Sequence, residues 1–364
     1  MTYCRGVGEH GIIFDTIVAT IQRGSLKDRF DRSHVLVTGG LGFIGSNLAM
    51  RLAALGALVT VVDAAVPGCG ANRFNLVGAQ GPIRVIEADL SQSEAYEEAA
   101  AVAGVVFNLA GEISHIQSMR DPVRDLRLNT FSQLHLLTTL GRVNPGVRVV
   151  YAGTRQVCGR PRYLPVDEDH PIDPVDFNGI HKRAAEHYHL LLSRDGLVDA
   201  IVLRLTNVYG PRLAIGVSGQ GFLPAFLGRV LRGEGLEVFG DGSQLRDPVY
   251  VDDVVDAFLL AAMQPKGGDR LFHLGGPEPL SLLEIARRIS EEAGIAAEVV
   301  RRPFPVEHLA FDIGSYTTDD RRLQSAMNWA PGTGFMDGIR QTLAYFRQHR
   351  VHYLVEARDS APAA

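Results

Sequence analysis

The stretch that decides the fold is His34-Val35-Leu36-Val37-Thr38-Gly39-Gly40-Leu41-Gly42-Phe43-Ile44-Gly45. An apolar strand leads directly into three spaced glycines, and the residues from Ser46 onward have the pattern of a helix. The first glycine would permit a tight turn, the second would let the backbone approach a pyrophosphate, and the third would let strand and helix pack closely. The N-terminus of such a helix offers unpaired N–H groups to phosphate. The stretch therefore predicts a dinucleotide site whose cofactor contacts are Gly39, Gly42, Phe43, Ile44 and Gly45.

A second apolar strand, at 58–63, ends in Asp63. An acid placed about 20 residues after the glycines hydrogen-bonds the ribose hydroxyls of the adenosine half. The next three residues are Ala64, Ala65 and Val66, so no arginine follows directly to pair with a 2′-phosphate. This pattern favours NAD over NADP.

The chain from 34 to 206 alternates strands with helices. Near-continuous apolar runs, typical of parallel strands covered on both faces, predict strands at 34–38, 58–63, 83–87, 104–109, 147–152 and 200–205. Helices are expected between them, at about 45–55, 121–141 and 180–194. Such alternation predicts an α/β fold with a doubly wound parallel sheet, in which ligands bind at the carboxyl ends of the strands.

Four further segments complete the expected organisation. Isoleucines at helical spacing predict an N-terminal helical extension within 1–33, packed on the outside of the domain or serving as a cap or a dimer contact. The NAD-binding Rossmann domain takes 34–206, and 245–275 is expected to return to it. The range 207–355 is mainly a smaller C-terminal α/β substrate domain, in which Ser281 and Glu284 form a capping box for a helix ending near 293. Residues 356–364 are expected to be a tail.

Composition excludes several classes of function. The 364 residues contain 36 Lys+Arg and 41 Asp+Glu, a formal net charge of −5 with no long basic run, so nucleic acid is not an expected partner. Cys4, Cys69 and Cys158 show no paired spacing, which is typical of the reducing cytoplasm. No apolar run approaches a membrane span, and the first residues lack a signal-peptide pattern. We therefore expect a cytoplasmic protein without membrane contact.

Several segments, taken in order, resemble the extended short-chain dehydrogenase/reductase superfamily, and most closely its NAD-dependent nucleotide-sugar epimerases and dehydratases. They are Thr38 to Leu48, Ala88-Asp89-Leu90, Asn108-Leu109-Ala110-Gly111, Arg204 to Arg212 and Gly242 to Asp253. The resemblance covers about 34–345. It implies that Asp89 and Leu90 hold adenine, that Leu109, Ala110 and Gly111 line the cofactor groove, and that Asn129 supports the cofactor and the active-site helix.

The resemblance also implies a catalytic Tyr-x-x-x-Lys pair with a nearby Ser or Thr. Lys182 matches the lysine, which would hold the nicotinamide ribose, and Thr154 matches the hydroxyl that binds the reacting sugar oxygen. The tyrosine position is Asn178. An amide cannot act as a base, so another group must supply that role or the oxidation step is altered. The candidate bases are Glu112, His115 and His181, and a water held by Asn178 and Thr154 is a further candidate.

The remaining polar positions divide between substrate contacts and structural roles. By resemblance, Arg212 and Arg246 would clamp the substrate's diphosphate, which suits the bidentate geometry of guanidinium. Asn207 and Gln220 would hydrogen-bond the sugar or a phosphate. The histidines at 181, 187 and 189 lack the spacing of a helical zinc site, and Asp252-Asp253 suits a helix start, so no metal is predicted.

The expected function is NAD-dependent remodelling of a nucleoside-diphosphate sugar, with 4-epimerisation through a transient 4-keto intermediate favoured. Arg155 and Gln156 follow Thr154 where similar dehydratases carry Asp-Glu, which counts against dehydration. Decarboxylation of a uronic acid stays open, because Arg155 would be able to hold a carboxylate. The functions of a non-catalytic NAD-binding sensor or scaffold, and of a net reductase, stay open as well. The resemblance also implies a homodimer formed through 121–141 and 180–194.

Overall fold

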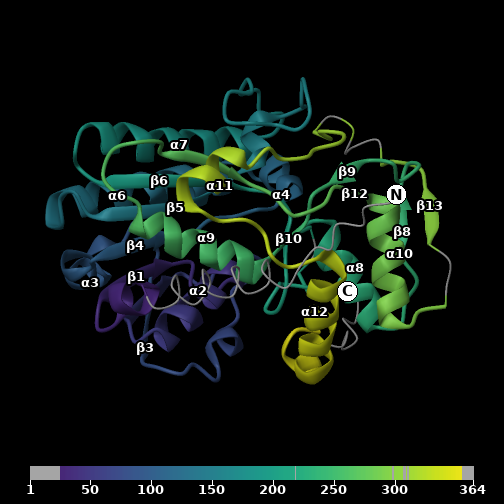
Figure 1. The fold of residues 1–364 in the computed structure, drawn as a ribbon, viewed down its shortest axis with the longest axis horizontal. Helices are drawn as coiled ribbons and strands as arrows, with labels where there is room; N and C mark the ends of the chain where they lie inside the picture. The colour runs from purple at the N-terminus through teal and green to yellow at the C-terminus, as the bar shows by residue number, and fades with distance from the viewer. Residues whose placement is uncertain (1–24, 218, 297–298, 306–308, 310, 355–364) are drawn as a thin grey trace, which may run out of the picture.

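The computed structural model describes residues 25–217, 219–296, 299–305, 309 and 311–354 (Figure 1). The helix expected around the isoleucines of 12–21 and the tail 356–364 lie outside the described residues.

A sheet of seven parallel strands forms the centre of the larger lobe, in the order β11-β6-β5-β4-β1-β2-β3 (Figure 1). The strands are β1 (His34–Thr38), β2 (Leu58–Asp63), β3 (Ile83–Glu87), β4 (Val105–Asn108), β5 (Arg148–Thr154), β6 (Asp199–Leu205) and β11 (Leu271–Leu274). The strand order reverses beside β1, which pairs with β2 on one side and β4 on the other. The expected fold class is therefore confirmed, and a doubly wound sheet opens a ligand crevice at such a reversal.

Helices cover both faces of this sheet. On one face, α2 (Phe43–Ala54) packs against α9 (Val251–Met263), and on the other lie α3 (Glu97–Val102), α6 (Ser132–Val143) and α7 (Phe177–Arg194). Because successive strand residues point to opposite faces, Val37 joins the core beneath α2 and α9 while Leu36 joins the core beneath α3 and α6. Both side chains are fully buried, which explains the near-continuous apolar strands in the sequence.

Short elements follow the carboxyl ends of the strands. They are η1 (Arg73–Leu76), η2 (Ser93–Ala95), α4 (His115–Arg120), α5 (Pro122–Leu126), the π-helical turn η3 (Arg127–Phe131) and η4 (Arg155–Cys158). Three of them, α4, η3 and η4, supply residues to the cleft described below. The single helix expected over 121–141 is therefore three consecutive segments, α5, η3 and α6. The Asp121 cap and Pro122 start the first of them.

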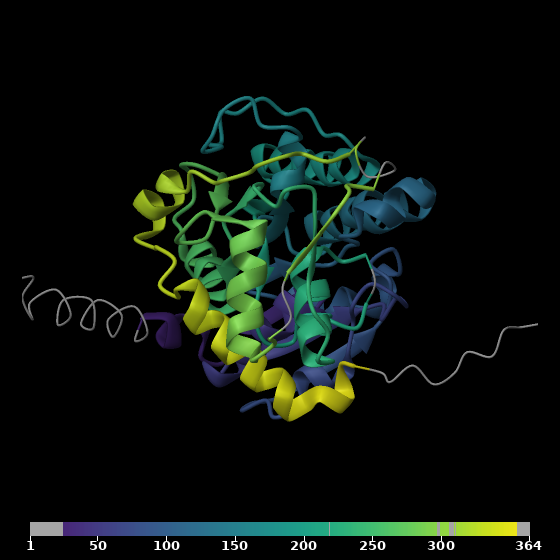
Figure 2. The ribbon, with the colours of Figure 1, turned by 90° about the vertical axis from the view of Figure 1, so that its right-hand side faces the viewer.

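A smaller lobe with its own core lies beside the carboxyl edge of the sheet (Figures 1 and 2). Its helices are α8 (Phe222–Leu231), α10 (Leu282–Ala293) and α12 (Phe335–His349), with the turn η6 (Arg350–His352) after them. Three two-stranded sheets accompany them, made by β7 (Val208–Tyr209) with β10 (Val249–Tyr250), β9 (Leu245–Arg246) with β12 (Leu280–Ser281), and β8 (Glu237–Phe239) with β13 (Val300–Arg302). The capping box of Ser281 and Glu284 opens α10, as predicted.

The chain returns to the large sheet after building part of the smaller lobe. Helix α9 covers the sheet face, and β11 then pairs with β6 from Leu271↔Val202 to Leu274↔Leu205. Helix α11 (Arg321–Met327) packs against β11 and α9 from a still later part of the chain. The two lobes are thus joined by several chain crossings rather than by one linker.

Candidate active site

A cleft of about 470 Å³ runs along the carboxyl ends of the central strands. Its wall on the sheet side takes residues from the ends of β1, β2, β4, β5 and β6, including Asp63, Thr154 and Thr206. The opposite wall takes residues 220–224 at the start of α8 in the smaller lobe. The cleft therefore lies where a doubly wound sheet binds its ligands, with the smaller lobe closing over it.

The glycine loop at one end of this cleft fits a dinucleotide. Gly39 has a φ of +68°, and a Cβ there would lie 2.7 Å from the Leu109 carbonyl oxygen. A Cβ on Gly45 would lie 2.2 Å from the carbonyl oxygen of Gly39, so only glycine permits this approach of α2 to β1. The first turn of α2 carries no acidic side chain and its N-cap, Gly42, makes no side-chain bond, which leaves the helix N-terminus open to phosphate.

Two carboxylates stand at the adenosine end of the cleft. Asp63 accepts hydrogen bonds from Leu41 N (2.9 Å) and Ala65 N (2.8 Å), which fix its carboxylate at the end of β2. Asp89 is held in the same way by Ser91, and Leu90 beside it also lines the cleft. Each carboxylate oxygen keeps lone pairs for further donors, so the expected ribose and adenine contacts are geometrically possible at these positions.

Lys182 lies deep in the middle of the cleft. Its side chain is buried on α7, and a Cβ on Gly111 would lie 2.7 Å from its Nζ. Burial lowers the pKa of Lys182 to about 8, although the charges of Asp125 and Glu112 act in the opposite direction. Asn129 stands beside the same glycine and accepts a hydrogen bond from Glu112 N at 3.0 Å. Asn129 is thus a buried support behind the cleft, while Lys182 faces into it.

Asn178 and Thr154 line the same cleft as this lysine. The Nδ2 of Asn178 donates to the Glu112 carbonyl (3.0 Å) and to the Asp125 carboxylate (3.1 Å). Both partners are acceptors, so the amide nitrogen must face them and its Oδ1 is the atom available to the cleft. Thr154 Oγ1 accepts from Gln156 N at 3.2 Å and keeps its hydroxyl proton to donate.

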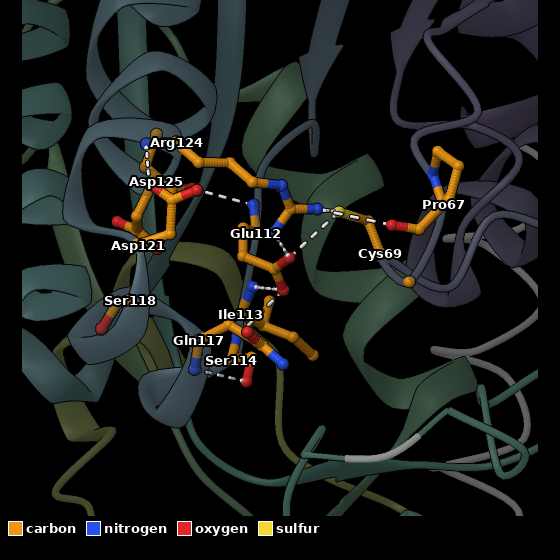
Figure 3. A network of polar contacts seen from close by, with 12 residues as sticks. Pro67, Cys69, Glu112, Ile113, Ser114, Gln117, Ser118, Asp121, Arg124 and Asp125 are labelled. Atoms are coloured by element: carbon orange, nitrogen blue, oxygen red, sulfur yellow. Dashed lines mark hydrogen bonds and ion pairs between the residues drawn. The ribbon is translucent and has the colours of Figure 1, made fainter. Parts of the chain in front are cut away.

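Glu112 does not line the cleft. Its buried carboxylate accepts from the backbone N–H groups of Ile113 (2.9 Å) and Ser114 (3.0 Å) and from the guanidinium of Arg124 at 3.2 Å, as Figure 3 shows. The thiol of Cys69 donates to the same carboxylate at 3.0 Å, and burial together with Glu112 raises the pKa of that thiol to about 12. With its lone pairs used in this way, Glu112 joins the loop after β2 to the loop after β4.

The two candidate histidines occupy different places. His181 is buried away from the cleft wall, with Nδ1 bound to Asp125 at 2.7 Å. His115, the first residue of α4, lines the cleft, and its Nδ1 lies 2.8 Å from the buried carboxylate of Asp176. Burial alone would raise the pKa of Asp176. His115 and the hydrogen bonds from Gly179 and Gln156 together outweigh burial, so the carboxyl pKa lies below its ordinary value. Among the three candidate bases, His115 is the one that the structure places in the cleft.

Of the four residues expected to bind the substrate, three line the cleft and one does not. Asn207, Gln220 and Arg246 line the cleft. Arg212 lies outside the lining, where it donates to Asn75 O (2.9 Å) and Asn47 Oδ1 (2.8 Å) and its guanidinium stacks on the Tyr345 ring. Arg212, expected from the sequence to clamp the diphosphate, is thus not among the residues that line the cleft.

For three polar residues of the site, the sequence predicted no role there. The buried Asp125 accepts a hydrogen bond from Asn178, the buried Asp176 lies 2.8 Å from His115 Nδ1, and Cys69 lines the cleft beside Glu112. The Asp-Phe-Asn-Gly run at 176–179 does carry a helix N-cap signal, and Asp176 caps α7 through Gly179 N. Asp125 gives no such signal, because only the packing of α5 on α7 brings it to Asn178.

Within the part of the chain that the structure describes, no three His, Cys, Asp or Glu side chains are grouped so that they could hold a metal ion. Among the same residues, no helix combines the length and apolarity needed to cross a membrane.

Comparison with known proteins identifies the family. The model of the NAD dependent epimerase/dehydratase family matches residues 35–275, which is more than half of the chain. This chain belongs to that family. NAD is therefore the cofactor of the cleft, consistent with the glycine loop and with Asp63.

Three relatives illustrate the range of the family. A UDP-glucose 4-epimerase of Mycolicibacterium smegmatis is 32% identical over 86% of this chain and 98% of its own length. UDP-glucuronic acid decarboxylase 1 of Xenopus tropicalis is 29% identical over 88% of this chain and 74% of its own. The solved structure of MoeE5 in complex with UDP-glucuronic acid and NAD is 28% identical, with a TM-score of 0.76, and the match covers 87% of this chain and all of that one.

Proposed function

We propose that this family member acts on nucleoside-diphosphate sugars and catalyses 4-epimerisation through a transient 4-keto sugar. The observation that carries the proposal is the shared cleft: Thr154, Lys182 and His115 line the same cavity as the nucleotide-binding glycines. The names of the relatives from Mycolicibacterium smegmatis and Xenopus tropicalis support a sugar nucleotide as the substrate class.

In the proposed mechanism, His115 replaces the absent tyrosine as the acid/base group. Thr154 donates a hydrogen bond to the C4 oxygen, and His115 accepts the proton of the C4 hydroxyl through the nitrogen that Asp176 does not contact. Asp176 orients the ring and stabilises the imidazolium that forms. NAD, when bound, supplies the reversible two-electron acceptor for C4.

Lys182 and Asn178 have positioning roles in this mechanism. The Lys182 ammonium holds the ribose next to the nicotinamide, and the amide Oδ1 of Asn178 accepts a hydrogen bond from the sugar or from a water. Epimerisation would require that C4 be reduced again on its opposite face while His115 returns the proton to the C4 oxygen, so NAD would be recycled and not consumed.

Decarboxylation of a nucleotide uronic acid is the second candidate. The cation of Arg155 in the cleft wall favours it, because this side chain directly follows Thr154 and would hold a carboxylate. Dehydration is disfavoured, since Gln156 in the same turn donates its amide to Asp176 at 3.0 Å and offers no acid.

A panel of nucleotide sugars tests this proposal. Purified protein is incubated with each sugar and NAD, products are identified by NMR, and absorbance at 340 nm reports NADH. We expect an altered sugar without net NADH. Bound NAD without conversion of any sugar would contradict the proposal and favour a sensor or scaffold, and stoichiometric NADH consumption would favour a reductase.

We also propose a homodimer formed through the segments α5 to α6 and α7. Apolar side chains on these helices are exposed in the single chain, among them Leu126, Phe131, Leu134, Ile180 and Leu191. Pairing of two copies would remove this surface from water. Light scattering should give twice the chain mass, and Leu134→Glu should shift the protein towards the monomer; a monomeric wild type would exclude the dimer.

A further inference from the structure

The sugar end of the cleft contains two arginines without a carboxylate partner. Arg155 and Arg246 both line the cavity, and within the described ranges neither forms an ion pair. Arg246 is only 7% exposed, and its Nε is buried without a hydrogen-bond partner. The NH1 nitrogen of Arg155 is likewise buried and without a partner among the described residues.

The partners that these arginines do have are neutral. Arg155 donates to Asn207 Oδ1 at 3.2 Å, and its guanidinium lies 4.9 Å from the centre of the Tyr316 ring. Arg246 donates to the backbone carbonyls of Leu245 (2.7 Å) and Gly314 (2.6 Å). These contacts fix the two side chains without neutralising them.

The nearest acids are already engaged elsewhere. Asp247 accepts from Thr206 Oγ1 at 2.6 Å and from Thr318 N at 2.7 Å, and Asp312 accepts from Gln244 at 3.1 Å. Burial and the neighbouring Arg155 charge lower the pKa of Arg246 to about 9, although the charges of Asp312 and Asp247 act in the opposite direction.

Other buried arginines of the same chain are paired. Arg204, 1% exposed, makes two 2.8 Å bonds to the carboxylate of Glu186. Arg148 binds Asp199 through Nε at 2.9 Å and NH2 at 2.5 Å. A buried charge without a partner is costly, so the two cleft arginines are arranged for anions that arrive with a ligand.

The position of Arg155 indicates which anion. It directly follows Thr154, the proposed hydrogen-bond donor to the C4 oxygen. In a hexopyranose the anomeric carbon that bears the diphosphate lies across the ring from C4, whereas C5, which bears C6, is bonded to C4. Arg155 lines the same cleft as Thr154, so we assign its guanidinium to an anion at C6 and not to the diphosphate.

Resting on the function proposed above, we propose that Arg155 binds the C6 carboxylate of a nucleoside-diphosphate uronic acid, while Arg246 holds the diphosphate. The guanidinium fork matches a carboxylate in geometry and charge. A neutral sugar with a C6 hydroxymethyl group leaves the half-buried Arg155 guanidinium without an anionic partner, so the cleft selects acidic sugars whether the outcome is epimerisation or decarboxylation.

The experiment compares matched uronic and neutral sugar nucleotides on the full chain with saturating NAD. The pairs are UDP-glucuronate with UDP-glucose and GDP-mannuronate with GDP-mannose, and the variants are Arg155→Gln and, as a control of equal charge change, Arg84→Gln on the exposed edge strand β3. Binding is measured by calorimetry and conversion by NMR. We expect the wild type and Arg84→Gln to favour the uronate of at least one pair by about 30-fold or more in Kd or kcat/KM.

In Arg155→Gln that preference should fall to within a few fold, while the Kd for NAD stays unchanged. Equal or better use of the neutral sugar by the wild type would overturn the carboxylate assignment and leave the proposed function intact. A preference that survives Arg155→Gln would also overturn it. Failure of every pair to bind or react would overturn the proposed function as well.

Discussion

The cofactor end and the sugar end of the cleft are built in different ways. The cofactor end is largely backbone: the turn at Gly39, the open N-terminus of α2 and the end of β2 come from one contiguous stretch of chain. The sugar end is made of side chains from distant segments, including His115, Thr154 and Arg246. A site made by a local turn is set by a few glycines, whereas a site made by side chains is able to change its chemistry one residue at a time without altering the fold.

The cofactor end should tolerate change least. Replacing Gly45 with alanine puts a Cβ 2.2 Å from the Gly39 carbonyl oxygen, where neither backbone segment is able to move freely. We expect Gly45→Ala to weaken NAD binding by about 100-fold or more, with a lower Tm. Calorimetric titration with NAD measures this, and Gly104→Ala, whose Cβ would meet its nearest atom at 3.6 Å, is the control. If Gly45→Ala bound NAD as tightly as the wild type, the cofactor site would not depend on the close approach of α2 to β1.

At the sugar end, the largest effect is expected at His115. His115→Asn should lower kcat by about 100-fold or more, as loss of a general base does, with the Kd for NAD unchanged. Asp176→Asn should lower kcat as well, because the ring loses the carboxylate that orients it. His34→Asn, at an exposed position of β1, should behave as wild type. Full activity in His115→Asn would leave Asn178 and a bound water to carry the proton transfer.

A smaller effect should follow from the loss of one ribose contact. Asp63→Ala removes the carboxylate from the adenosine end, together with its hydrogen bonds from Leu41 N and Ala65 N, but keeps the three glycines. We expect the Kd for NAD to rise by about 10-fold, which corresponds to about 1.4 kcal/mol for a charged hydrogen bond. Asp28→Ala, before β1, is a control of equal charge change. Titrations that superimpose for Asp63→Ala and wild type would contradict the ribose assignment.

Asn178→Tyr tests whether the sugar end has been rebuilt around a different base. The tyrosine would remove the donor that Glu112 O and the buried Asp125 carboxylate share, and an acceptor left without its donor costs about 1–3 kcal/mol. We therefore expect a lower free energy of unfolding, measured in urea, and no gain in kcat. A large gain in turnover would mean that Asn178 is a degenerated tyrosine position, which would weaken the case for His115.

The smallest effect concerns Lys182 in NAD-free protein. Because burial lowers its pKa from 10.5 to about 8, the unfolded chain keeps this proton between those pH values while the folded chain has lost it. The free energy of unfolding contributed by this side chain therefore rises from pH 8 to 10.5. In Lys182→Met this rise is absent, so Tm of wild type minus Tm of variant should increase by a few degrees over the interval. Parallel Tm curves would show that the ammonium is better solvated than its burial indicates.

The same contrast explains what the sequence was able to predict. The strand-glycine-helix pattern at 34–45 and the apolar runs of the later strands located the parallel sheet and the cofactor cleft, because both depend on local spacing. Sequence spacing placed His181 on the same helix face as Asn178, but it did not reveal that Asp125 on α5 holds the ring away from the cleft. The approach of His115 to Asp176 across 61 positions, and the hydrogen bond from Arg212 to Asn47, likewise depend on packing between elements.

Strand β11 is synthesised long after β6, the strand with which it pairs. Strand β6 is buried along its whole length, yet one edge of it is paired only when residues 271–274 come into place. During synthesis, that edge stays unpaired until about 65 further residues, including much of the smaller lobe, have left the ribosome. An unpaired, apolar strand edge is a template for association between nascent chains, so a transcript truncated after β6 should yield insoluble product and not a free-standing cofactor-binding fragment.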